Sequence, residues 1–450
     1  MSDTKPRIVI LGGGFGGIYA ALEFERAMAR GADLDVTLVN RDNFFLFTPM
    51  LHEVAASDLD ITNIVSPVRK LLRRVTFFHG DIESIDLVNR RVGVSHGHEH
   101  HCHSLPYDHM ILALGSVTNF FSLPGLADRA LTMKSLGDAI FLRNRLISNL
   151  EEADFECCPM VRAPLLNFVV AGGGFAGVET IAGMNDFLRE AVRFYPHLRE
   201  DMLRVILVHP GKLILPELAE KLGAYAQRKL AERGVEIKTN CRVTAVTDRE
   251  VSLSDGTTVT SNTLIWTAGT SPNPLCDTMP CAKERGRLAV NEYLEVPGWP
   301  GVWALGDCAL VPNPKTGKAH PPTAQHALRE GRVAARNILA TIRGDRKRPF
   351  VFSTLGQLAA IGKRTGVANV FGINFSGFFD WWLWRTVYLL KLPRFEKKLR
   401  VALDWTLDLL FSKDLVQFMT VRTSAVSMPM TDPVKATEQE MVMAGNGKAR

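Results

Sequence analysis

The chain has 450 residues, of which 46% are hydrophobic and 22% are charged, and its formal net charge is +6. The length favours two or three domains, and the composition is ordinary for a globular protein. The seven cysteines form no C-x-x-C pair, which argues against a zinc ribbon or a redox-active dithiol and is typical of a reducing compartment. Residues 1–7 are short and polar, so we expect no secretory signal.

The first predicted unit is a strand, a glycine-rich turn and a helix. Residues 8–11 are apolar and predict a buried strand, and Gly12, Gly14 and Gly17 follow in G-x-G-x-x-G spacing. Such glycines allow a tight turn, a close approach to a pyrophosphate and close packing of helix on strand. The helix N-terminus adds free N–H groups for the phosphates. A second strand at residues 36–40 completes a βαβ unit, so we predict a dinucleotide site.

The next two features of the sequence concern the predicted dinucleotide site. Asn40 stands where a carboxylate usually binds the adenosine ribose, and its amide can also hydrogen-bond a hydroxyl. Residues 43–53 are expected to form an apolar loop around Pro49. The loop either packs in the core or lays Thr48, Pro49 and Leu51 against a flat aromatic cofactor.

Residues 96–103 read His-Gly-His-Glu-His-His-Cys-His, a composition that allows metal binding. They lie between a predicted strand at residues 91–95 and an apolar stretch that follows Tyr107. We therefore expect an exposed hairpin tip and assign no metal site.

The glycine motif recurs at residues 167–177, 160 positions after the first, and a helix over residues 136–152 leads to it. A second pair of similar segments, residues 112–119 and 266–273, follows two further apolar strands. Internal duplication explains both repeats. Two dinucleotide folds in one chain predict two dinucleotides, one resident and one exchanging.

The second repeat carries two notable polar residues. Glu179 is expected in the first turn of its helix, either as a partner of the helix dipole or as a carboxylate that steers or relays a proton beside the reacting ring. His209 stands where the ribose-binding acid of this domain is expected, so the residues do not choose between NADH and NADPH.

Residues 302–308 predict a strand that ends in Gly306 and Asp307. An aspartate there would reach a ribityl hydroxyl or the pyrophosphate and would return the chain to the first domain. Pro321 and Pro322 then predict the start of a helix that packs on the core through its alanines.

The C-terminal third is basic and aromatic. Residues 343–400 hold twelve Lys or Arg against three acidic residues, and four of the seven tryptophans fall within residues 381–405. The aromatic stretch at 375–392 is too short and too charged to span a bilayer, which takes roughly 20 apolar residues. Residues 395–411 predict an amphipathic helix in the plane of a membrane surface, with a domain-capping or dimer helix as the alternative. At the membrane we expect basic residues to steer binding and apolar side chains to be buried: Lys391, Arg394, Lys397, Lys398 and Arg400 for the first, and Trp381, Trp382, Trp384 and the leucine stripe at Leu399 for the second.

The double glycine motif, the Gly306–Asp307 segment and the Ala324–Gln325 helix together resemble the pyridine nucleotide-disulfide oxidoreductase-like flavoproteins. Among these the chain most resembles the type II NADH:quinone oxidoreductases, from about residue 5 to about residue 415. The resemblance implies non-covalent FAD on the first repeat, NAD(P)H on the second and a quinone near Ala324 and Gln325. The chain departs from the family at Asn40, His209 and Arg329.

The resemblance also implies a set of site residues. Glu179 and Gln325 are the expected catalytic residues. The expected FAD-binding residues are Gly12, Gly14, Phe15, Gly16, Gly17, Asn40, Arg41, Thr48, Pro49, Leu51, Ala113, Gly115, Gly306, Asp307, Ala324 and Gln325. The expected NAD(P)H-binding residues are Gly172, Gly174, Phe175, Ala176, Gly177, Glu179, His209, Ala268 and Gly269.

We thus expect an α/β fold with two Rossmann-like dinucleotide-binding domains and a C-terminal amphipathic helical region that anchors the protein to a membrane. The expected limits are 5–120 and 301–345 for the FAD-binding domain, and 121–300 for the NAD(P)H-binding domain with its linker. The membrane-associated region would cover 346–420, and a disordered tail 421–450.

The expected reaction is a ping-pong oxidation of NADH with two-electron reduction of a membrane quinone and without proton pumping. The expected partners are the quinone, an anionic membrane surface and a second copy of the chain, and no nucleic acid. We expect a peripheral protein on the cytoplasmic face of the inner (plasma) membrane.

Two alternatives stay open. A sulfide:quinone or related reductase would need paired cysteines near the flavin, and in the sequence only Cys157–Cys158 offers a pair. An NADH-sensing flavoprotein would act through partner proteins that dock on the C-terminal helices.

Overall fold

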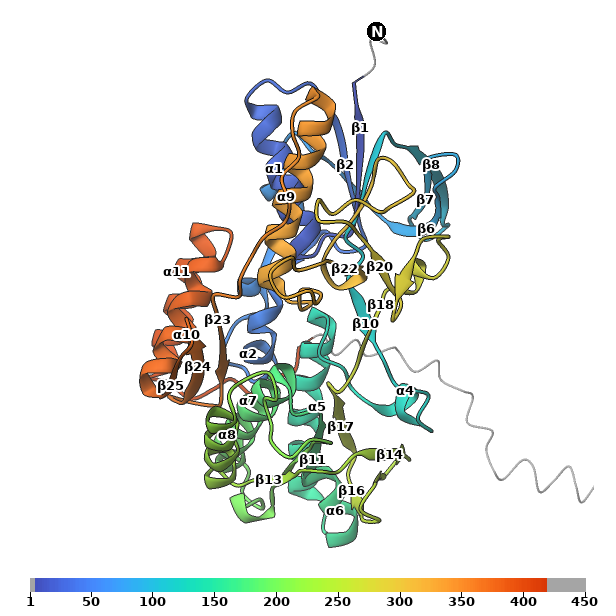
Figure 1. Ribbon diagram of the computed structural model, residues 1–450. Helices are drawn as coiled ribbons and strands as arrows, with labels where there is room; N and C mark the ends of the chain where they lie inside the picture. Colours follow the sequence, from blue (N-terminus) through green and yellow to red (C-terminus); the bar gives the residue numbers. More distant parts are fainter. Residues whose placement is uncertain (1–4, 419–450) are drawn as a thin grey trace, which may run out of the picture. The chain divides into compact units, whose positions relative to one another are not determined.

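The structure is a computed structural model and describes residues 5–418 (Figure 1). Residues 5–415 form one compact unit. The tail predicted at 421–450 lies outside the described residues.

A five-stranded parallel sheet carries the first glycine motif, with strand order β21-β9-β1-β2-β5. The strands are β1 Arg7–Leu11, β2 Asp35–Asn40, β5 Thr76–His79, β9 His109–Leu112 and β21 Val302–Ala304. Helix α1 Phe15–Ala29 connects β1 to β2. This confirms the predicted βαβ unit and the return of the chain through residues 302–304. The central strands are apolar along their length because a parallel sheet is covered on both faces.

Helix α9 Ala324–Arg343 lies along α1 (Figure 1) and confirms the helix predicted after the two prolines. A Cβ atom on Gly331 would come within 2.1 Å of the Gly16 carbonyl oxygen. The two backbones approach this closely because neither position carries a side chain.

The segment expected as a loop at 43–53 is instead regular structure. It forms β3 Phe44–Leu46, the short 3₁₀ helix η1 Thr48–Met50 and α2 Leu51–Ala55. Pro49 can stand in the first turn of a helix because the N–H that it lacks would have no intrahelical partner there. β3 pairs with β4 Val65–Pro67, and η2 Ile61–Ile64 and α3 Val68–Leu71 flank that strand.

The histidine-rich segment forms the tip of a hairpin, as predicted. Strands β6 Asp81–Asp86, β7 Arg91–His96 and β8 His101–Pro106 make an antiparallel sheet. The His96 and His103 rings stack, and their Nε2 atoms are 2.9 Å apart. Across residues 5–418 the structure brings together no group of three His, Cys, Asp or Glu side chains that could hold a metal ion.

A second parallel sheet carries the second glycine motif, with strand order β13-β12-β11-β17. The strands are β11 Asn167–Ala171, β12 Arg204–Val208, β13 Val235–Lys238 and β17 Thr263–Trp266. The helices of this region are α5 Leu136–Phe155, α6 Pro159–Leu166, α7 Phe175–Ala191 and α8 Glu220–Glu232, with η3 Val192–Phe194 and η4 Glu200–Met202. A side sheet is formed by β14 Val243–Val246, β15 Glu250–Leu253 and β16 Thr258–Thr260.

The two sheets are connected through the repeated segments themselves. β10 Ser116–Thr118 pairs antiparallel with β18 Thr270–Pro272, and α4 Leu126–Arg129 follows β10. The chain then returns through η5 Pro274–Cys276, β19 Lys283–Glu284, β20 Arg287–Ala289, η6 Gly306–Cys308 and β22 Ala309–Leu310.

The C-terminal region forms a small sheet with two helices. The sheet contains β23 Gly356–Ala360, β24 Gly366–Val370 and β25 Ile373–Gly377, all antiparallel. α10 Phe378–Lys391 packs on this sheet, and α11 Phe395–Leu407 contacts α10 and η2. Within the described residues no helix is long and apolar enough to cross a bilayer.

Candidate active site

A cavity of about 630 Å³ is lined by the N-terminal ends of both glycine-motif helices. From α1 come Gly14, Phe15 and Gly16, and from α7 come Phe175, Ala176 and Glu179. The remaining wall includes Thr48, Pro49, Leu51, His52, Ala113, Gly115, Ser116, Lys134, Gly269, Gly306, Asp307, Ala324 and Tyr388. Segments that lie far apart in the sequence therefore meet around one space.

The first glycine turn has the geometry that a bound pyrophosphate needs. Gly12 has a φ of +105°, and a Cβ on Gly17 would lie 1.8 Å from the Gly12 carbonyl oxygen. Both positions therefore require glycine. Gly14 has an ordinary extended backbone, and a Cβ there would meet nothing within 4 Å because it would stand in the cavity. These residues fit a dinucleotide whose phosphates lie at the start of α1.

The second glycine turn repeats this geometry. Gly172 has a φ of +118°, and a Cβ on Gly177 would lie 1.8 Å from the Gly172 carbonyl oxygen. Gly174 is again extended, with Glu217 Oε1 3.4 Å from an added Cβ as its nearest neighbour. The duplication seen in the sequence is therefore a duplication of backbone geometry.

Asn40 and His209 also occupy equivalent positions and make equivalent bonds. Asn40 Oδ1 accepts a hydrogen bond from Gly13 N at 2.7 Å, and His209 Nδ1 accepts one from Gly173 N at 3.1 Å. Burial lowers the pKa of His209, so the ring is neutral and, with Nδ1 accepting, carries its proton on Nε2. Each side chain therefore stabilises the adjacent glycine turn by accepting a hydrogen bond from its backbone.

Asp307 belongs to a polar chain inside the cavity. Its Oδ2 accepts a hydrogen bond from Ser116 Oγ at 2.6 Å, and Ser116 Oγ accepts one from Lys134 Nζ at 2.9 Å. Burial lowers the pKa of Lys134, and the negative charge of Asp307 opposes that shift. Ser116 could have been found from the repeated segment that contains it, whereas no pattern in the sequence points to Lys134.

Glu179 was expected in the first turn of its helix, and that expectation is wrong. α7 begins at Phe175, so Glu179 lies in the second turn, and the first turn holds no acidic residue. The helix dipole is therefore not its partner. Glu179 Oε1 instead accepts hydrogen bonds from Ala360 N at 3.2 Å and from Trp384 Nε1 at 3.1 Å, both in the C-terminal region.

Burial raises the pKa of Glu179 to about 8; these two hydrogen bonds oppose the rise, and Glu53, once it is ionised, adds to it. The carboxyl group is thus protonated at neutral pH. His52 Nδ1 lies 3.8 Å from Glu179 Oε2, but burial lowers the pKa of His52 to about 3. The two side chains are both neutral near pH 7 and form no ion pair.

Glu53 is a second buried carboxyl group that the sequence analysis missed. Burial raises its pKa to about 8, and the positive charge of Arg385 opposes this shift from 3.9 Å away. Glu53 Oε2 accepts a hydrogen bond from Trp405 Nε1 at 3.2 Å. No local motif marks Glu53, since its surroundings come from helices more than 300 residues away in the sequence.

The expected quinone residues lie at the start of α9. Ala324 lines the cavity, and Gln325 Nε2 donates to the Gly356 carbonyl at 3.3 Å without being part of the cavity wall. Arg329 donates to the Gln325 carbonyl at 2.7 Å and covers the Phe352 ring. Tyr388, which the sequence analysis did not select, lines the cavity nearby.

The cavity wall contains fifteen of the expected site residues and leaves the others outside it. Those outside are Gly12, Gly17, Asn40, Arg41, Gln325, Gly172, Gly174, Gly177, His209 and Ala268. Gly12, Gly17, Gly172 and Gly177 shape the turns behind the wall. Arg41 is exposed and pairs with Asp81 at 2.6 Å. Cys157 and Cys158, the only adjacent cysteines, follow α5 and also lie outside the wall.

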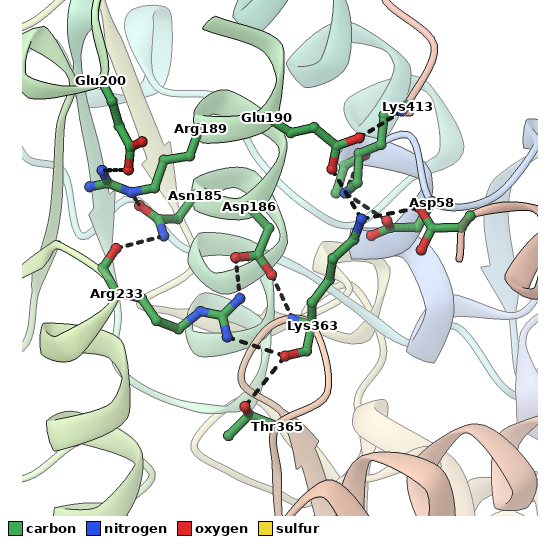
Figure 2. A network of polar contacts seen from close by, with 12 residues as sticks. Asp58, Asn185, Asp186, Arg189, Glu190, Glu200, Arg233, Lys363, Thr365 and Lys413 are labelled. Carbon is green, nitrogen blue, oxygen red and sulfur yellow. Dashed lines mark hydrogen bonds and ion pairs between the residues drawn. The ribbon is translucent and has the colours of Figure 1, made fainter. Parts of the chain in front are cut away.

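A polar network attaches the C-terminal region to α7, as Figure 2 shows. Lys363 donates from its backbone to Asp186 and from its side chain to Glu190, the latter at 3.0 Å. Lys413 donates from its backbone to Glu190 at 2.8 Å, and its ammonium group lies 2.6 Å from Asp58 Oδ1. The helix that bears Glu179 is therefore clamped against the region that supplies the hydrogen-bond donors to Glu179.

The two C-terminal helices present apolar side chains outward. Phe395, Leu399, Leu403 and Leu407, spaced by four along α11, are all at least half exposed. On α10 the side chains of Phe378, Phe379, Trp382 and Leu390 are exposed as well. The leucine stripe thus faces away from the core, which is the reverse of a helix packed in an ordinary globular protein.

Two residues that we expected on the membrane side point inward instead. Trp384 is 1% exposed because it packs beside His52 and donates to Glu179. Lys397 is 6% exposed and donates to the Thr62 carbonyl. A buried lysine needs such an acceptor because burying an unpaired ammonium group is costly.

Comparisons with known proteins agree with this arrangement. The sequence model of the pyridine nucleotide-disulphide oxidoreductase family matches residues 6–331, and that of the NDH2 C-terminal domain matches residues 355–414. The type II NADH:quinone oxidoreductase Ndh of Mycobacterium tuberculosis is 33% identical over 91% of this chain and 89% of its own length. The demethylphylloquinone reductase NdbB of Synechocystis is 32% identical over 90% of this chain and 96% of its own length.

A solved structure shares the fold. NDH2 of Plasmodium falciparum in complex with NADH superposes with a TM-score of 0.86 at 21% identity, covering 92% of this chain and all of that chain.

Proposed function

The chain belongs to the type II NADH:quinone oxidoreductases of the pyridine nucleotide-disulphide oxidoreductase family, and we propose that its nucleotides and quinone meet in the cavity between the two glycine motifs. The protein is an FAD-dependent enzyme that oxidises NADH and reduces a quinone without pumping protons. When bound, FAD supplies the two-electron chemistry that couples the two half-reactions.

One observation supports this cavity as the place where both nucleotides bind. A single cavity is lined by both Gly14–Gly16 and Phe175–Ala176, the N-terminal ends of two helices that follow glycine turns. Each helix end offers N–H groups to a pyrophosphate. We assign the α1 end, with Gly115 and Asp307, to FAD and the α7 end to NADH. The cavity wall between these two helix ends would hold both nucleotides.

A matched pair of valine substitutions tests this assignment. Gly14 and Gly174 both have φ and ψ values that valine can adopt, so the substitution adds bulk without backbone strain. We expect purified Gly14→Val to lack flavin absorbance. Gly174→Val should remain yellow but lose NADH oxidation, by roughly a hundredfold in kcat/KM, or about 2.7 kcal/mol.

The outcomes separate the two sites because flavin content and turnover are read independently. A fully flavin-loaded Gly14→Val protein would contradict the FAD assignment. Unchanged kcat/KM for NADH in Gly174→Val would contradict the NADH assignment.

We assign proton handling during quinone reduction to Glu179. Its carboxyl group is protonated at neutral pH, faces the cavity and is held by Trp384 and Ala360. A quinone that accepts two electrons also takes up two protons, and a neutral carboxylic acid at the reacting ring can donate one. The quinone itself would enter past Ala324 and Tyr388, which line the same cavity.

The apolar stripes of α10 and α11 support attachment to a membrane surface. An in-plane helix buries leucines and aromatic rings among lipid chains, and basic residues meet anionic headgroups. Lys391 and Arg400 are exposed beside those stripes. A tailed quinone stays in the lipid, so an enzyme that binds through these helices would meet its substrate there.

Two further assignments rest on the family resemblance. We propose the cytoplasmic face of the inner (plasma) membrane as the location and a homodimer as the assembly. Sedimentation of the purified protein at micromolar concentration tests the dimer, since a monomer mass would contradict it.

A further inference from the structure

Strand β23 contacts both of the expected catalytic residues along one edge. Gln325 Nε2 donates to the Gly356 carbonyl at 3.3 Å, and Ala360 N donates to Glu179 Oε1 at 3.2 Å. β23 is an edge strand of its sheet, so the backbone groups on its free edge need partners outside the sheet. Leu358, between the two bonded positions, lines the cavity. The free edge of β23 is therefore the backbone against which both side chains are held.

The turn that follows β23 is held by an ion pair between α7 and the end of α8. Lys363 N donates to Asp186 Oδ2 at 2.6 Å, Arg233 Nη1 donates to the Lys363 carbonyl at 3.2 Å, and Arg233 Nη2 pairs with Asp186 (Figure 2). Gly362 has a φ of +103°, and a Cβ there would lie 2.8 Å from Asp186 Oδ2. The turn approaches the ion pair this closely because glycine stands there. Both backbone groups of Lys363 are thus bonded to one ion pair.

One face of α7 carries both contacts to the β23–β24 hairpin. Glu179 and Asp186 lie about two turns apart on this helix and so point the same way. Glu179 binds the last residue of β23, and Asp186 binds the turn three residues later. The turn is short and internally bonded, since Ile361 N donates to the Thr365 carbonyl at 3.0 Å. A restraint on the turn is therefore also a restraint on the end of β23.

The hairpin contributes a hydrogen bond to Glu179 and no charge. The titratable side chains that face the Glu179 carboxyl group are His52 and Glu53 of α2 and Tyr388 of α10. The Ala360 N–H is the group of the hairpin that acts on the pKa of Glu179, and it lowers that pKa against the effect of burial. Moving the hairpin away would therefore favour the protonated form of Glu179.

We propose that Asp186 is a positioning residue for quinone reduction, because it fixes the turn after β23 and so keeps the Ala360 N–H on Glu179. The proposal rests on the proton-handling role proposed above for Glu179. Asp186 lies outside the cavity wall, so it acts through β23 without touching a ligand. The same restraint keeps the edge of β23 against Gln325.

Asp186→Ala in the full-length, flavin-loaded enzyme tests the proposal. Without the carboxylate the Lys363 N–H loses its acceptor, so the turn should shift, and the hydrogen bond from Ala360 to Glu179 should lengthen. The fall in kcat for quinone reduction at alkaline pH should then move to higher pH, by about one pH unit.

A second measurement reads the protonation of Glu179 without any quinone. The infrared band of its protonated carboxyl group is identified by its loss in Glu179→Gln and titrated with pH in the oxidised enzyme. Its midpoint should rise in Asp186→Ala by the same amount as the kinetic midpoint. Asp186→Asn keeps the volume and one oxygen acceptor, so its midpoint should rise by less, and this variant serves if the alanine variant does not take up flavin.

Arg189→Met is the matched control. Arg189 lies on the same helix and in the same network, but its hydrogen bonds go to Asn185, Glu200 and Gly234, and none of those described reaches the hairpin (Figure 2). Both midpoints should therefore stay at the wild-type pH in this variant, although it also loses hydrogen bonds of α7.

An infrared midpoint in Asp186→Ala that equals the wild-type value would overturn the proposal, as would an equal rise in Arg189→Met. Failure of the role proposed for Glu179 has a different signature. In that case Glu179→Gln would reduce quinone as fast as the wild type, and the infrared midpoint would still rise in Asp186→Ala.

Discussion

At the scale of single residues, the main chemical feature is a pair of buried carboxyl groups, Glu179 and Glu53. Glu179 and Glu53 both have pKa values raised to about 8 by burial, and each is held by a tryptophan N–H from the C-terminal helices. At neutral pH both are protonated and uncharged. This state suits a proton donor, since a protonated acid costs far less to bury than a carboxylate.

Glu179→Gln should slow quinone reduction and change its dependence on pH. The proton on Glu179 is present below pH 8 and is lost as the pH rises through that value, so wild-type kcat should fall above about pH 8. Glutamine keeps the acceptor for Trp384 but has no titrating proton. Its kcat should therefore be lower, by roughly 10²-fold, and flat across this range. A variant whose pH profile matches the wild type would exclude Glu179 as the titrating group.

His209 should control the choice between NADH and NADPH. The neutral ring does not repel a 2′-phosphate, whereas a carboxylate at this position would. We expect His209→Glu to lower kcat/KM for NADPH relative to NADH at least tenfold, or about 1.4 kcal/mol. Asn40→Asp, the equivalent change in the first repeat, should leave that ratio unaltered. An unchanged ratio in His209→Glu would assign His209 to bracing Gly173 alone.

Helix α11 shows how one element serves two environments. Val401 and Trp405 are buried against the rest of the protein, and the leucines at 399, 403 and 407 lie on the exposed side. A helix with two apolar faces in water needs a second apolar medium for the outer one. The bilayer surface is that medium in our proposal.

Replacing the three outer leucines with serine should weaken binding to anionic liposomes. At about 1.5 kcal/mol or more for each buried leucine, the loss is on the order of a thousandfold in affinity. NADH oxidation by a soluble acceptor should stay within about twofold of the wild type, because the leucines lie outside the cavity wall. Serine at the exposed positions Phe155, Met160 and Val161 is the matched control. Equal liposome binding by both triple variants would contradict a membrane role for α11.

At the scale of the whole molecule, the C-terminal region completes the site instead of forming a separate appendage. Its strand β23 and helix α10 supply the donors to Glu179, and Lys363 and Lys413 clamp it to α7 (Figure 2). Lys413 is 1% exposed at its side chain and neutralises Asp58. The residues that hold the C-terminal region and the carboxyl group of Glu179 therefore lie on one helix, α7.

Lys413→Ala should destabilise the protein strongly. Removing one partner of a buried ion pair leaves an uncompensated charge on Asp58 and costs about 3–5 kcal/mol of unfolding free energy. Arg199 is exposed and pairs with Asp201, so Arg199→Ala should lower the free energy of unfolding by no more than about 1 kcal/mol. Denaturant unfolding measures both, and Asp58→Asn in the Lys413→Ala background should recover part of the loss. Equal stability of the two single variants would contradict this account.

The sequence by itself determined the elements whose physics is local. The glycine turns, the strands beside them, the helix after Pro321 and the hairpin at the histidines follow from spacing, turn chemistry and periodicity within a few residues. The duplication could also be read directly, since residues 7–17 and 167–177 carry the same pattern. These features gave the fold class and the family.

Only the tertiary structure decided which side chains meet across the chain. Trp384 was expected at the lipid and lies instead against Glu179. Lys134 joins the cavity wall from a segment without a motif, and Glu53 is buried against Trp405 of α11. The physical reason is that burial, pKa and ion pairing depend on neighbours brought together by packing, and no local pattern encodes a neighbour that lies hundreds of residues away.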